Sequence, residues 1–231
     1  MAGFARLKES YDFVILGGGH AGLQAGLKAA LLGYTAAIID RGIKFSRSFY
    51  APKMDNIPGF PEGVSGHVLL DRQVESLRSV GEAVGLFTPA RAVAAAKTDS
   101  GFSVEFDWLA RRHTARGKVL VLALGVVDRI PEVGGRIDTI FPWANQAIVE
   151  FCILCDGHTL PGKTVAVLGS DAFAARTALD LLHFRPKTVE MLLHGQSLLV
   201  DSPPEERAAL NEALSGAKIS TVAPVITGFD G

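Results

Sequence analysis

The sequence predicts an α/β protein with two doubly wound parallel sheets. A buried strand, a glycine-rich turn, a helix and a second strand follow one another twice, over residues 11–39 and again over residues 164–193. Glycine is abundant, at 25 of 231 residues, and the glycines follow apolar runs, where the backbone has to turn tightly. Hydrophobic residues make up 48% of the chain and charged residues 20%, as in a folded globule.

The first fifty residues predict a strand, a helix and a second strand. Residues 11–16 (YDFVIL) are a short apolar run that fits a buried parallel strand. Residues 21–32 carry apolar side chains at helical spacing and end before a glycine that suits a helix terminus. The β-branched and apolar residues 35–39 form the second strand, which ends at Asp40.

The next segments predict a loop, a helix and further strands. Residues 45–66 contain the glycine- and proline-rich run NIPGFPEG and are expected to form a loop. Residues 68–84 predict a helix with charges on one face, and residues 90–106 predict short strands around a turn at Asp99-Ser100-Gly101. Residues 119–123 (VLVLA) predict another buried strand.

A second strand–turn–helix–strand unit follows a connection near residues 128–135. Residues 164–168 (TVAVL) predict a strand that is followed by a glycine. Residues 173–183 predict a helix, and residues 188–193 predict the next strand. The chain is therefore expected to contain two parallel sheets.

Charge and hydropathy exclude several classes of function. Lys plus Arg is 23 and Asp plus Glu is 24, which gives a net charge of −1 and no basic field for nucleic acid or an anionic membrane. No run approaches the roughly 18 apolar residues that a membrane span needs. The chain has two cysteines, too few for a disulfide framework, and the expected compartment is the reducing cytoplasm.

The first glycine turn fits the pattern G-x-G-x-x-G, follows a strand and opens a helix. Its glycines permit a tight turn, a close backbone approach to a pyrophosphate and close helix–strand packing. The helix N-terminus supplies N–H groups for the pyrophosphate. The carboxylate that ends the next strand can accept a hydrogen bond from a ribose hydroxyl. The alternative is a glycine turn needed only for packing. The predicted dinucleotide-binding residues are Gly17, Gly19, His20, Ala21, Gly22 and Asp40.

The two cysteines form a C-x-x-C motif, Cys152-Ile153-Leu154-Cys155, followed by Asp156. Three interpretations are a redox pair, half of a zinc site and coincidence. Structural zinc needs four ligands, and no second Cys/His cluster exists, so no metal site is predicted. A redox pair fits best, because two thiols at this spacing can close a disulfide. Asp156 is a candidate to move protons to and from the departing thiolate, and its structural alternative is a cap.

In this order, the segments resemble the low-molecular-weight thioredoxin reductase family of flavoproteins, FAD-dependent pyridine nucleotide-disulfide oxidoreductases. The resemblance implies two Rossmann-like domains and a homodimer. It assigns residues 1–127 to an FAD-binding domain and residues 128–224 to an NAD(P)H-binding-like domain that carries the cysteines. Residues 225–231 would begin the return to the FAD domain, whose C-terminal part is missing from this chain. The resemblance rests on VILGGGHAGLQAGL, NIPGFP, VLVLALG, CILCDG and GKTVAVLG.

The resemblance also implies roles for individual residues. The fingerprint glycines and Asp40, with Arg41 adjacent, would hold the ADP half of FAD. The residues expected beside the isoalloxazine are Asn56, Ala123 and Gly125. Cys155 would face the flavin as the charge-transfer thiol, Cys152 would exchange with the substrate disulfide, and Asp156 would be the acid–base residue. The implied substrate is a thioredoxin-like protein or a small disulfide.

The sequence departs from the family pattern in four places. Asp171 stands where the second fingerprint has its third glycine, and a carboxylate there would repel a pyrophosphate. Residues 194–196 (HGQ) lack the arginines with which the family reads the 2′-phosphate of NADPH. Leu124 replaces a threonine beside the flavin. The chain stops at Gly231, where the family returns to the FAD domain.

The leading hypothesis is an FAD-dependent thiol-disulfide oxidoreductase that passes electrons between the flavin and a substrate disulfide through Cys152 and Cys155. An alternative keeps the fold and the flavin but does not use NADPH or NADH. It would be a ferredoxin-dependent reductase or an oxygen-using dithiol oxidase. A third hypothesis is a catalytically silent flavin or nucleotide binder that serves as a sensor or partner module.

Overall fold

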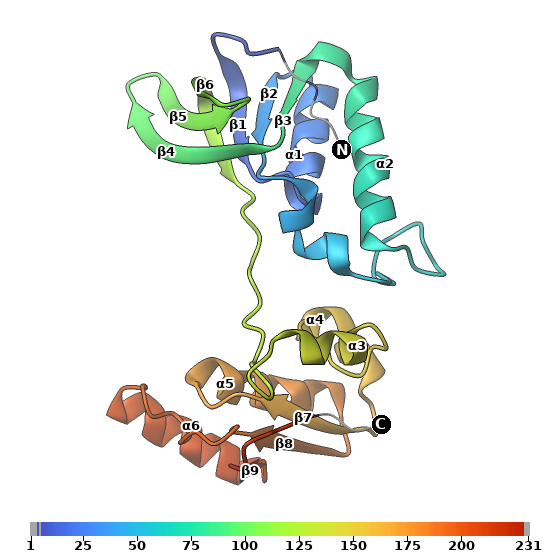
Figure 1. Cartoon of the computed structure of the whole chain (residues 1–231), viewed down its shortest axis with the longest axis vertical. Helices are drawn as coiled ribbons and strands as arrows, with labels where there is room; N and C mark the ends of the chain where they lie inside the picture. Colours follow the sequence, from blue (N-terminus) through green and yellow to red (C-terminus); the bar gives the residue numbers. More distant parts are fainter. Residues whose placement is uncertain (1–3, 5, 229–231) are drawn as a thin grey trace. The chain divides into compact units, whose positions relative to one another are not determined.

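The computed structural model describes residue 4 and residues 6–228, and the chain divides into two compact units (Figure 1). The first unit spans residues 1–127 and the second spans residues 128–231. Each unit has its own sheet and its own buried core.

The first unit contains a six-stranded sheet in the order β3-β2-β1-β6-β5-β4. β2 and β6 flank β1 and run parallel to it, β3 is parallel to β2, and β5 and β4 extend the sheet in antiparallel fashion. Leu16 pairs with both Ile39 and Leu122, so the carboxyl ends of the three central strands lie level. The strands are β1 (Tyr11–Leu16), β2 (Ala36–Ile39), β3 (Val84–Phe87), β4 (Ala90–Thr98), β5 (Gly101–Trp108) and β6 (Arg111–Leu122).

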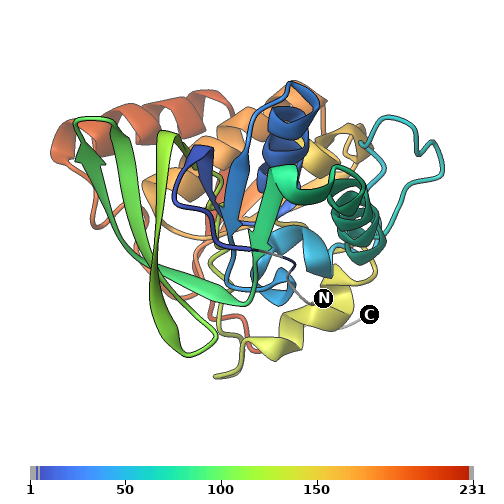
Figure 2. The same ribbon diagram turned by 90° about the horizontal axis from the view of Figure 1, so that it is seen from above.

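Two helices, α1 (His20–Leu31) and α2 (Gly66–Ser79), cover one face of this sheet (Figures 1 and 2). Their apolar side chains share a buried cluster with residues of β1, β2 and β3, including Ile15 and Ile38. A second cluster comes from strands and strand ends alone, with Phe87 packed edge-on against Phe106. The predicted α/β class is confirmed.

The helix expected over residues 68–84 ends at Ser79, which corrects that prediction. Gly81 has φ +64°, a conformation that ends a helix, and the chain then enters β3 at Val84. All four residues of β3 are buried. The run VGLF was too short to be distinguished from the end of a helix by periodicity alone.

The strand expected over residues 119–123 is also corrected. It is the last part of β6, which starts at Arg111. It is not fully buried, since Val119 is 42% exposed and Leu122 is 65% exposed. Val121 and Leu120 pack on opposite clusters, as the alternation of a strand requires.

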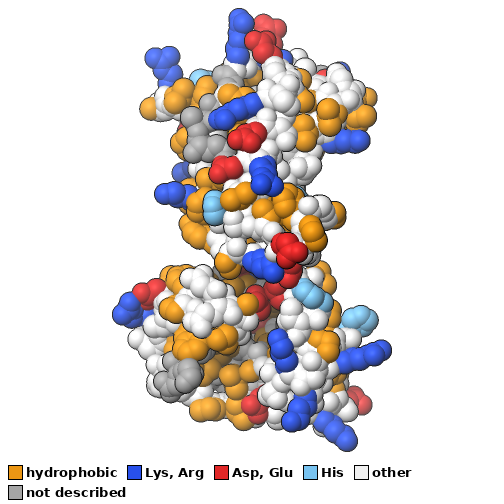
Figure 3. Space-filling model, turned by 90° about the vertical axis from the view of Figure 1, so that its right-hand side faces the viewer, with side chains coloured by type: hydrophobic (Ala, Val, Ile, Leu, Met, Phe, Trp, Pro, Cys, Tyr) orange, Lys and Arg blue, Asp and Glu red, His pale blue; other side chains and the backbone are white. Residues whose placement is uncertain are grey.

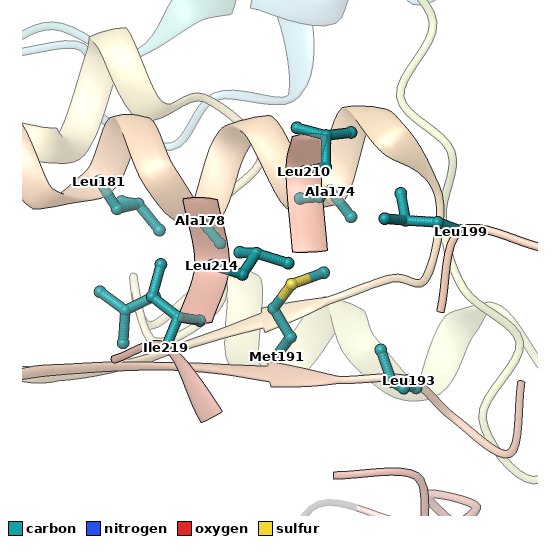
Figure 4. Close-up of a cluster of buried hydrophobic side chains, with 11 residues drawn as sticks. Ala174, Ala178, Leu181, Met191, Leu193, Leu199, Leu210, Leu214 and Ile219 are labelled. Carbon is teal, nitrogen blue, oxygen red and sulfur yellow. The ribbon is translucent and has the colours of Figure 1, made fainter. Parts of the chain in front are cut away.

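The second unit contains a three-stranded parallel sheet in the order β7-β8-β9. The strands are β7 (Thr164–Leu168), β8 (Thr188–Leu192) and β9 (Ser220–Val222), and the longer helices are α5 (Ala172–Leu181) and α6 (Pro204–Gly216). Met191 of β8 lies beneath Ala178 of α5 and Leu214 of α6 in one buried cluster (Figure 4).

Short helical segments complete the two units. α3 (Phe141–Ala144) and α4 (Ile153–Asp156) belong to the second unit. The 3-10 turns are Ile43–Phe45, Arg47–Tyr50, Gly81–Ala83, Asp138–Ile140, Gly157–Thr159 and Leu182–Phe184. Within the described part of the chain, no helix combines the length and the apolar character needed to cross a bilayer.

The C-terminal segment stays with the second unit as far as it is described. The Ile226 N–H donates to Nδ1 of His194 at 3.0 Å. Residues 229–231, part of the segment expected to return to the first domain, lie outside the described residues.

Charged side chains of both signs are interspersed on the face shown in Figure 3. This mixture agrees with the formal net charge of −1.

Candidate functional site

The glycine turn after β1 brings three segments of the first unit together. Gly17 has φ +104°, and a side chain there would overlap the carbonyl oxygen of Ala123. A Cβ on Gly22 would overlap the carbonyl oxygen of Gly17. Helix α1 therefore starts directly against the ends of β1 and β6. This is the carboxyl edge of the parallel strands, where open α/β sheets bind ligands.

Helix α1 presents its N-terminus without a side-chain cap. Its N-cap is Gly19, with φ −75° and ψ −173°, and no side chain accepts a hydrogen bond there. The first-turn N–H groups of His20, Ala21 and Gly22 are therefore not used by a capping side chain, and they lie at the positive end of the helix dipole. Such a terminus suits an anion.

Asp40 lies beside this turn, at the end of β2. Its Oδ1 accepts the Gly18 N–H at 2.8 Å, and its Oδ2 accepts the Gly42 N–H at 2.9 Å. The Thr88 hydroxyl donates to Oδ2 at 3.3 Å. These contacts fix the carboxylate, which can accept about four hydrogen bonds in all. The structure therefore places Asp40 against the glycine turn.

His20 is linked to a buried glutamine of α2. Nε2 of Gln73 lies 2.5 Å from Nδ1 of His20. Nδ1 accepts this hydrogen bond, so the ring hydrogen is on Nε2. Gln73 is 6% exposed, and its Oε1 has no hydrogen-bond partner among the described residues. An unpartnered buried amide oxygen is costly, and a donor from a ligand would satisfy it.

The other residues expected to bind a cofactor lie farther along the same unit. The Arg41 guanidinium lies 4.2 Å from the ring centre of Phe45, a cation–π contact. Gly125 has φ +69° and follows Leu124, which is 69% exposed. Asn56 is exposed, on the loop that precedes α2. The structure thus brings the turn, Asp40 and residue 123 together, while Asn56 lies on a separate loop.

Cys152 and Cys155 form a disulfide in the second unit. Cys152 is the N-cap of α4, and its Sγ accepts the Cys155 N–H at 3.2 Å. Both cysteines and Asp156, the last residue of α4, are half-buried, whereas Leu154 between the cysteines is 85% exposed. The N–H that points at Cys152 Sγ would stabilise negative charge on that sulfur once the disulfide opens.

Gly157, two residues after the cysteine motif, lies against the ring of Phe184. A Cβ on Gly157 would come within 2.5–2.6 Å of three ring atoms of Phe184. Ile153 of α4 packs against the buried cluster of the second unit. A side chain at residue 157 would therefore have to displace the Phe184 ring.

The second glycine turn, after β7, differs from the first in its cap. Helix α5 has Asp171 as its N-cap, and Oδ1 of Asp171 accepts the Ala174 N–H at 2.9 Å. Arg129 lies 3.4 Å from Oδ2 of the same carboxylate. The chain thus supplies its own anion at this helix N-terminus.

A cavity of about 400 Å³ lies at the carboxyl ends of β7 and β8. On its wall, the Ser170 hydroxyl donates to Oε1 of Gln196 at 2.9 Å. Nε2 of His194 lies 2.9 Å from the carbonyl oxygen of Glu132, and Nδ1 accepts the Ile226 N–H. Both nitrogens of His194 are therefore engaged, with the ring hydrogen on Nε2. The lining residues are Pro131, Glu132, Gly135, Leu168, Gly169, Ser170, Leu193, His194 and Gln196.

The order of strand, glycine turn and helix in both units, with a cysteine pair before the second, matches a known family. The profile described as "Pyridine nucleotide-disulphide oxidoreductase" matches residues 11–225. The chain belongs to this family.

Similar proteins within the family are thioredoxin reductases. The chain is 27% identical to the thioredoxin reductase of Aquifex aeolicus over 84% of its length, which covers 56% of that relative. It is 26% identical to the thioredoxin reductase of Borreliella burgdorferi over 74% of its length and 49% of that relative. The chain thus spans about half the length of these relatives.

A solved structure shares the fold. The thioredoxin reductase from Giardia duodenalis superimposes with a TM-score of 0.74 and 20% identity, over 97% of this chain and 67% of that one. The predicted fold class and family resemblance are confirmed.

The first unit of this family member has features that suit the ADP half of FAD. A Cβ-free turn leaves room for a pyrophosphate, and the uncapped N-terminus of α1 supplies donors and positive potential. The oriented carboxylate of Asp40 faces the turn, and the buried Oε1 of Gln73 lacks a donor. The residues present therefore fit the pyrophosphate and the ribose of this group.

Sequence reasoning missed four residues that shape these sites. Thr88 and Gln73 act from segments distant in sequence, so no local pattern marks them. The Phe184 ring lies against Gly157, two residues after the cysteine motif, although the two are far apart in sequence. Arg129 contacts Asp171 from the connection between the units, and an arginine on an exposed connection carries no signal of a partner.

Proposed function

We propose that this protein is an FAD-dependent thiol-disulfide oxidoreductase that acts through the Cys152–Cys155 pair. The observation that carries the proposal is the closed disulfide on α4, in a chain whose first unit has the features of an FAD site. The substrate class is a thioredoxin-like protein or a small disulfide. The proposal includes a homodimer in the cytoplasm, where the surroundings keep thiols reduced.

The first unit would bind the cofactor through its backbone and one carboxylate. The α1 N-terminus after Gly19 would hold the pyrophosphate, and Asp40 would accept a hydrogen bond from a ribose hydroxyl. Arg41 follows Asp40 at the ADP half, and Asn56, Ala123 and Gly125 are assigned to the isoalloxazine side. Bound FAD supplies a carrier for two electrons.

The cysteines would transfer the electrons in two exchange steps. Two electrons and two protons convert the Cys152–Cys155 disulfide into two thiols, with Asp156 as the group that moves a proton. Cys152 then loses its thiol proton, and the resulting thiolate attacks the substrate disulfide, forms a mixed disulfide and releases one substrate thiolate, which takes up a proton. Attack of Cys155 on Cys152 Sγ re-forms the internal disulfide and releases the second substrate thiol.

Two single-cysteine variants test these roles in the purified full-length protein. Cys152→Ser leaves Cys155 free, and a long-wavelength charge-transfer absorbance is expected. Cys155→Ser leaves Cys152 free and should lack that band. Both variants should lose disulfide turnover. Full turnover in either variant, or a folded wild-type protein that takes up no flavin at saturating FAD, would contradict the proposal.

A second candidate keeps the flavin and the dithiol but exchanges electrons with ferredoxin or oxygen instead of NADPH. The loop after β8 favours it. This loop offers no arginine to a 2′-phosphate, His194 is hydrogen-bonded through both nitrogens, and Gln196 is engaged with Ser170. Anaerobic reduction of the bound flavin by micromolar NADPH would exclude this candidate.

A further inference from the structure

We propose that Asp171 is a specificity-determining residue that closes the second unit to pyridine dinucleotides by occupying the anion position with its own carboxylate. The inference deepens the proposed function, on which it rests, because it names the feature that selects the electron partner. It concerns binding to the second unit alone and requires no assumption about how the two units are arranged.

The position of the carboxylate carries the argument. In a G-x-G-x-x-G turn, the third fingerprint residue lets the backbone approach a pyrophosphate. Asp171 stands at the place that Gly19 holds in the first turn, and its Oδ1 takes the Ala174 N–H, a donor of the first turn of α5. A dinucleotide would have to displace this oxygen and then lie against its negative charge.

The backbone conformation at Asp171 matches that at Gly19, so the Asp171 carboxylate stands where a bound phosphate would stand in the first unit. Asp171 has φ −87° and ψ 176°, and Gly19 has φ −75° and ψ −173°. The two N-caps thus share one backbone conformation. In α5, one donor of the first turn, the Ala174 N–H, is already satisfied within the chain.

Lack of space does not explain the closure. The cavity lined by Gly169 and Ser170, the two residues that precede Asp171, measures about 400 Å³, within the range of small-molecule sites. Arg129 does not restore a phosphate site, because its NH1 is turned toward Oδ2 of Asp171. That ion pair is exposed, with side chains 93% and 51% accessible, so the backbone hydrogen bond is the firmer of the two anchors.

The two units therefore differ in whether the N-terminus of their helix can accept a negatively charged ligand. The first unit leaves its helix N-terminus to an external anion, whereas the second unit neutralises its own. Removing the Asp171 side chain should therefore reopen the second site. NADH is the expected ligand after reopening, since residues 194–196 supply no cation for the extra phosphate of NADPH.

Calorimetric titration of NADH and NADPH into the full-length protein tests the inference. Asp171→Gly removes both the charge and the cap, and Asp171→Asn removes the charge but keeps a capping oxygen. Asp180→Asn is the matched control, because it changes the net charge equally on the exposed far end of the same helix. Circular dichroism and a thermal melt establish that each variant is folded.

We expect wild-type protein and Asp180→Asn to bind neither nucleotide below millimolar concentration. Asp171→Gly should bind NADH at least tenfold more tightly than wild type and more tightly than NADPH. Asp171→Asn should gain less than Asp171→Gly but more than the control, and it carries the test if the glycine variant does not fold. Micromolar binding by the wild type, or no gain in a folded Asp171 variant, would overturn the inference.

The same samples separate this inference from the proposed function. Flavin uptake is measured by absorbance in each preparation before the titration. A wild-type protein that takes up no FAD defeats the proposed function, while the nucleotide titration still decides the role of Asp171. A yellow wild-type protein that also binds NADH defeats the inference about Asp171 and leaves the proposed function standing.

Discussion

The two units begin with the same sequence of a parallel strand, a glycine turn and a helix, and they diverge at the cap of that helix. In the first unit the cap is Gly19, which contributes no side chain, and in the second it is Asp171, which bonds to the Ala174 N–H. The backbone angles of the two caps differ by only about 10°, as a shared fold would allow. A single side chain therefore decides whether the helix terminus is available to a ligand.

The strongest test of this comparison transplants the cap. Gly19→Asp should place a carboxylate at the N-terminus of α1 in the geometry of Asp171. FAD affinity should then fall about 100-fold, equivalent to ~2.8 kcal/mol, because the carboxylate and the pyrophosphate would compete for the same donors and repel each other. The measurement is quenching of FAD fluorescence on titration of the apo-protein.

Gly19→Ala is the matched control for added bulk. Its Cβ would lie 3.1 Å from the Ser46 hydroxyl oxygen, which belongs to a side chain able to rotate. The alanine variant should lose less than tenfold in affinity, about 1.4 kcal/mol. Equal affinities for the aspartate and alanine variants would show that size, and not charge, governs the first site.

A second test compares the last fingerprint position, which is Gly22 in the first turn and Ala174 in the second. Gly22→Ala would overlap the Gly17 carbonyl oxygen and should lower the free energy of unfolding by about 1–3 kcal/mol, the usual cost of overpacking. Ala174→Gly removes a buried methyl group and should cost about 1 kcal/mol. Urea unfolding followed by circular dichroism measures both.

Gly216→Ala provides the control for a helical glycine in open space. A Cβ there meets no atom within 4 Å among the described residues, so the variant should be neutral or slightly more stable. If Gly22→Ala proved as harmless as Gly216→Ala, the close contact between α1 and the turn would play no part in stability.

The sequence predicted the parts of the fold that depend on local pattern. Strands β1 and β7 lie where their apolar runs placed them, because both are followed by glycine turns that end the run sharply. Strand β3 was missed, since its four residues gain their strand conformation from pairing with β2 and carry no period of their own. The first eight residues of β6 were missed for a similar reason: their partners are β1 and β5.

The candidate sites show the same difference between local patterns and long-range contacts. The glycine turn, Asp40 and the cysteine motif could be predicted from the sequence, because each is a short pattern with a chemical reason. The cap formed by Asp171 was anticipated as a repulsive charge, but its bond to Ala174 and its contact with Arg129 required coordinates. Gln73 and Phe184 could not be found, because side-chain contacts between distant segments leave no local signal.

A third test measures what Asp171 contributes to its own unit. Asp171→Ala removes an N-cap hydrogen bond and should destabilise α5 by about 1 kcal/mol. Gly19→Ala removes no such hydrogen bond, because the N-cap of α1 has no side chain, so the stability of α1 should not fall for this reason. Hydrogen exchange of the α5 and α1 amides reports on each unit separately.

Asp180→Ala, on the exposed last part of α5, controls for the loss of a charge from the same helix. Equal protection of α5 in the Asp171 and Asp180 variants would mean that the carboxylate at the N-terminus does not stabilise its helix.

The smallest expected effect concerns the opposite end of the sheets, where Asp12 marks another difference between the units. Asp12 accepts hydrogen bonds from the Thr35 N–H and hydroxyl, at 2.9 and 3.0 Å, and pairs with Lys118 at 2.7 Å. The hydrogen bond from Lys118, followed by those from Thr35, lowers the pKa of Asp12 from 3.8 to about 2. Counted back from the fingerprint glycines, the matching residue of β7 is the uncharged Thr164.

Because its pKa is lowered in the folded state, Asp12 stabilises the first unit above about pH 4, and this contribution is lost as the pH falls from 4 to 2. Asp12→Asn should therefore reduce the protection of β1 amides against hydrogen exchange at pH 6, with a difference from wild type that shrinks toward pH 2. Protection of β7 should not change at any pH. Asp71→Asn, on the exposed face of α2, should match the wild type throughout. A difference that persists undiminished at pH 2 would show that the carboxylate stabilises β1 through its shape and not through its charge.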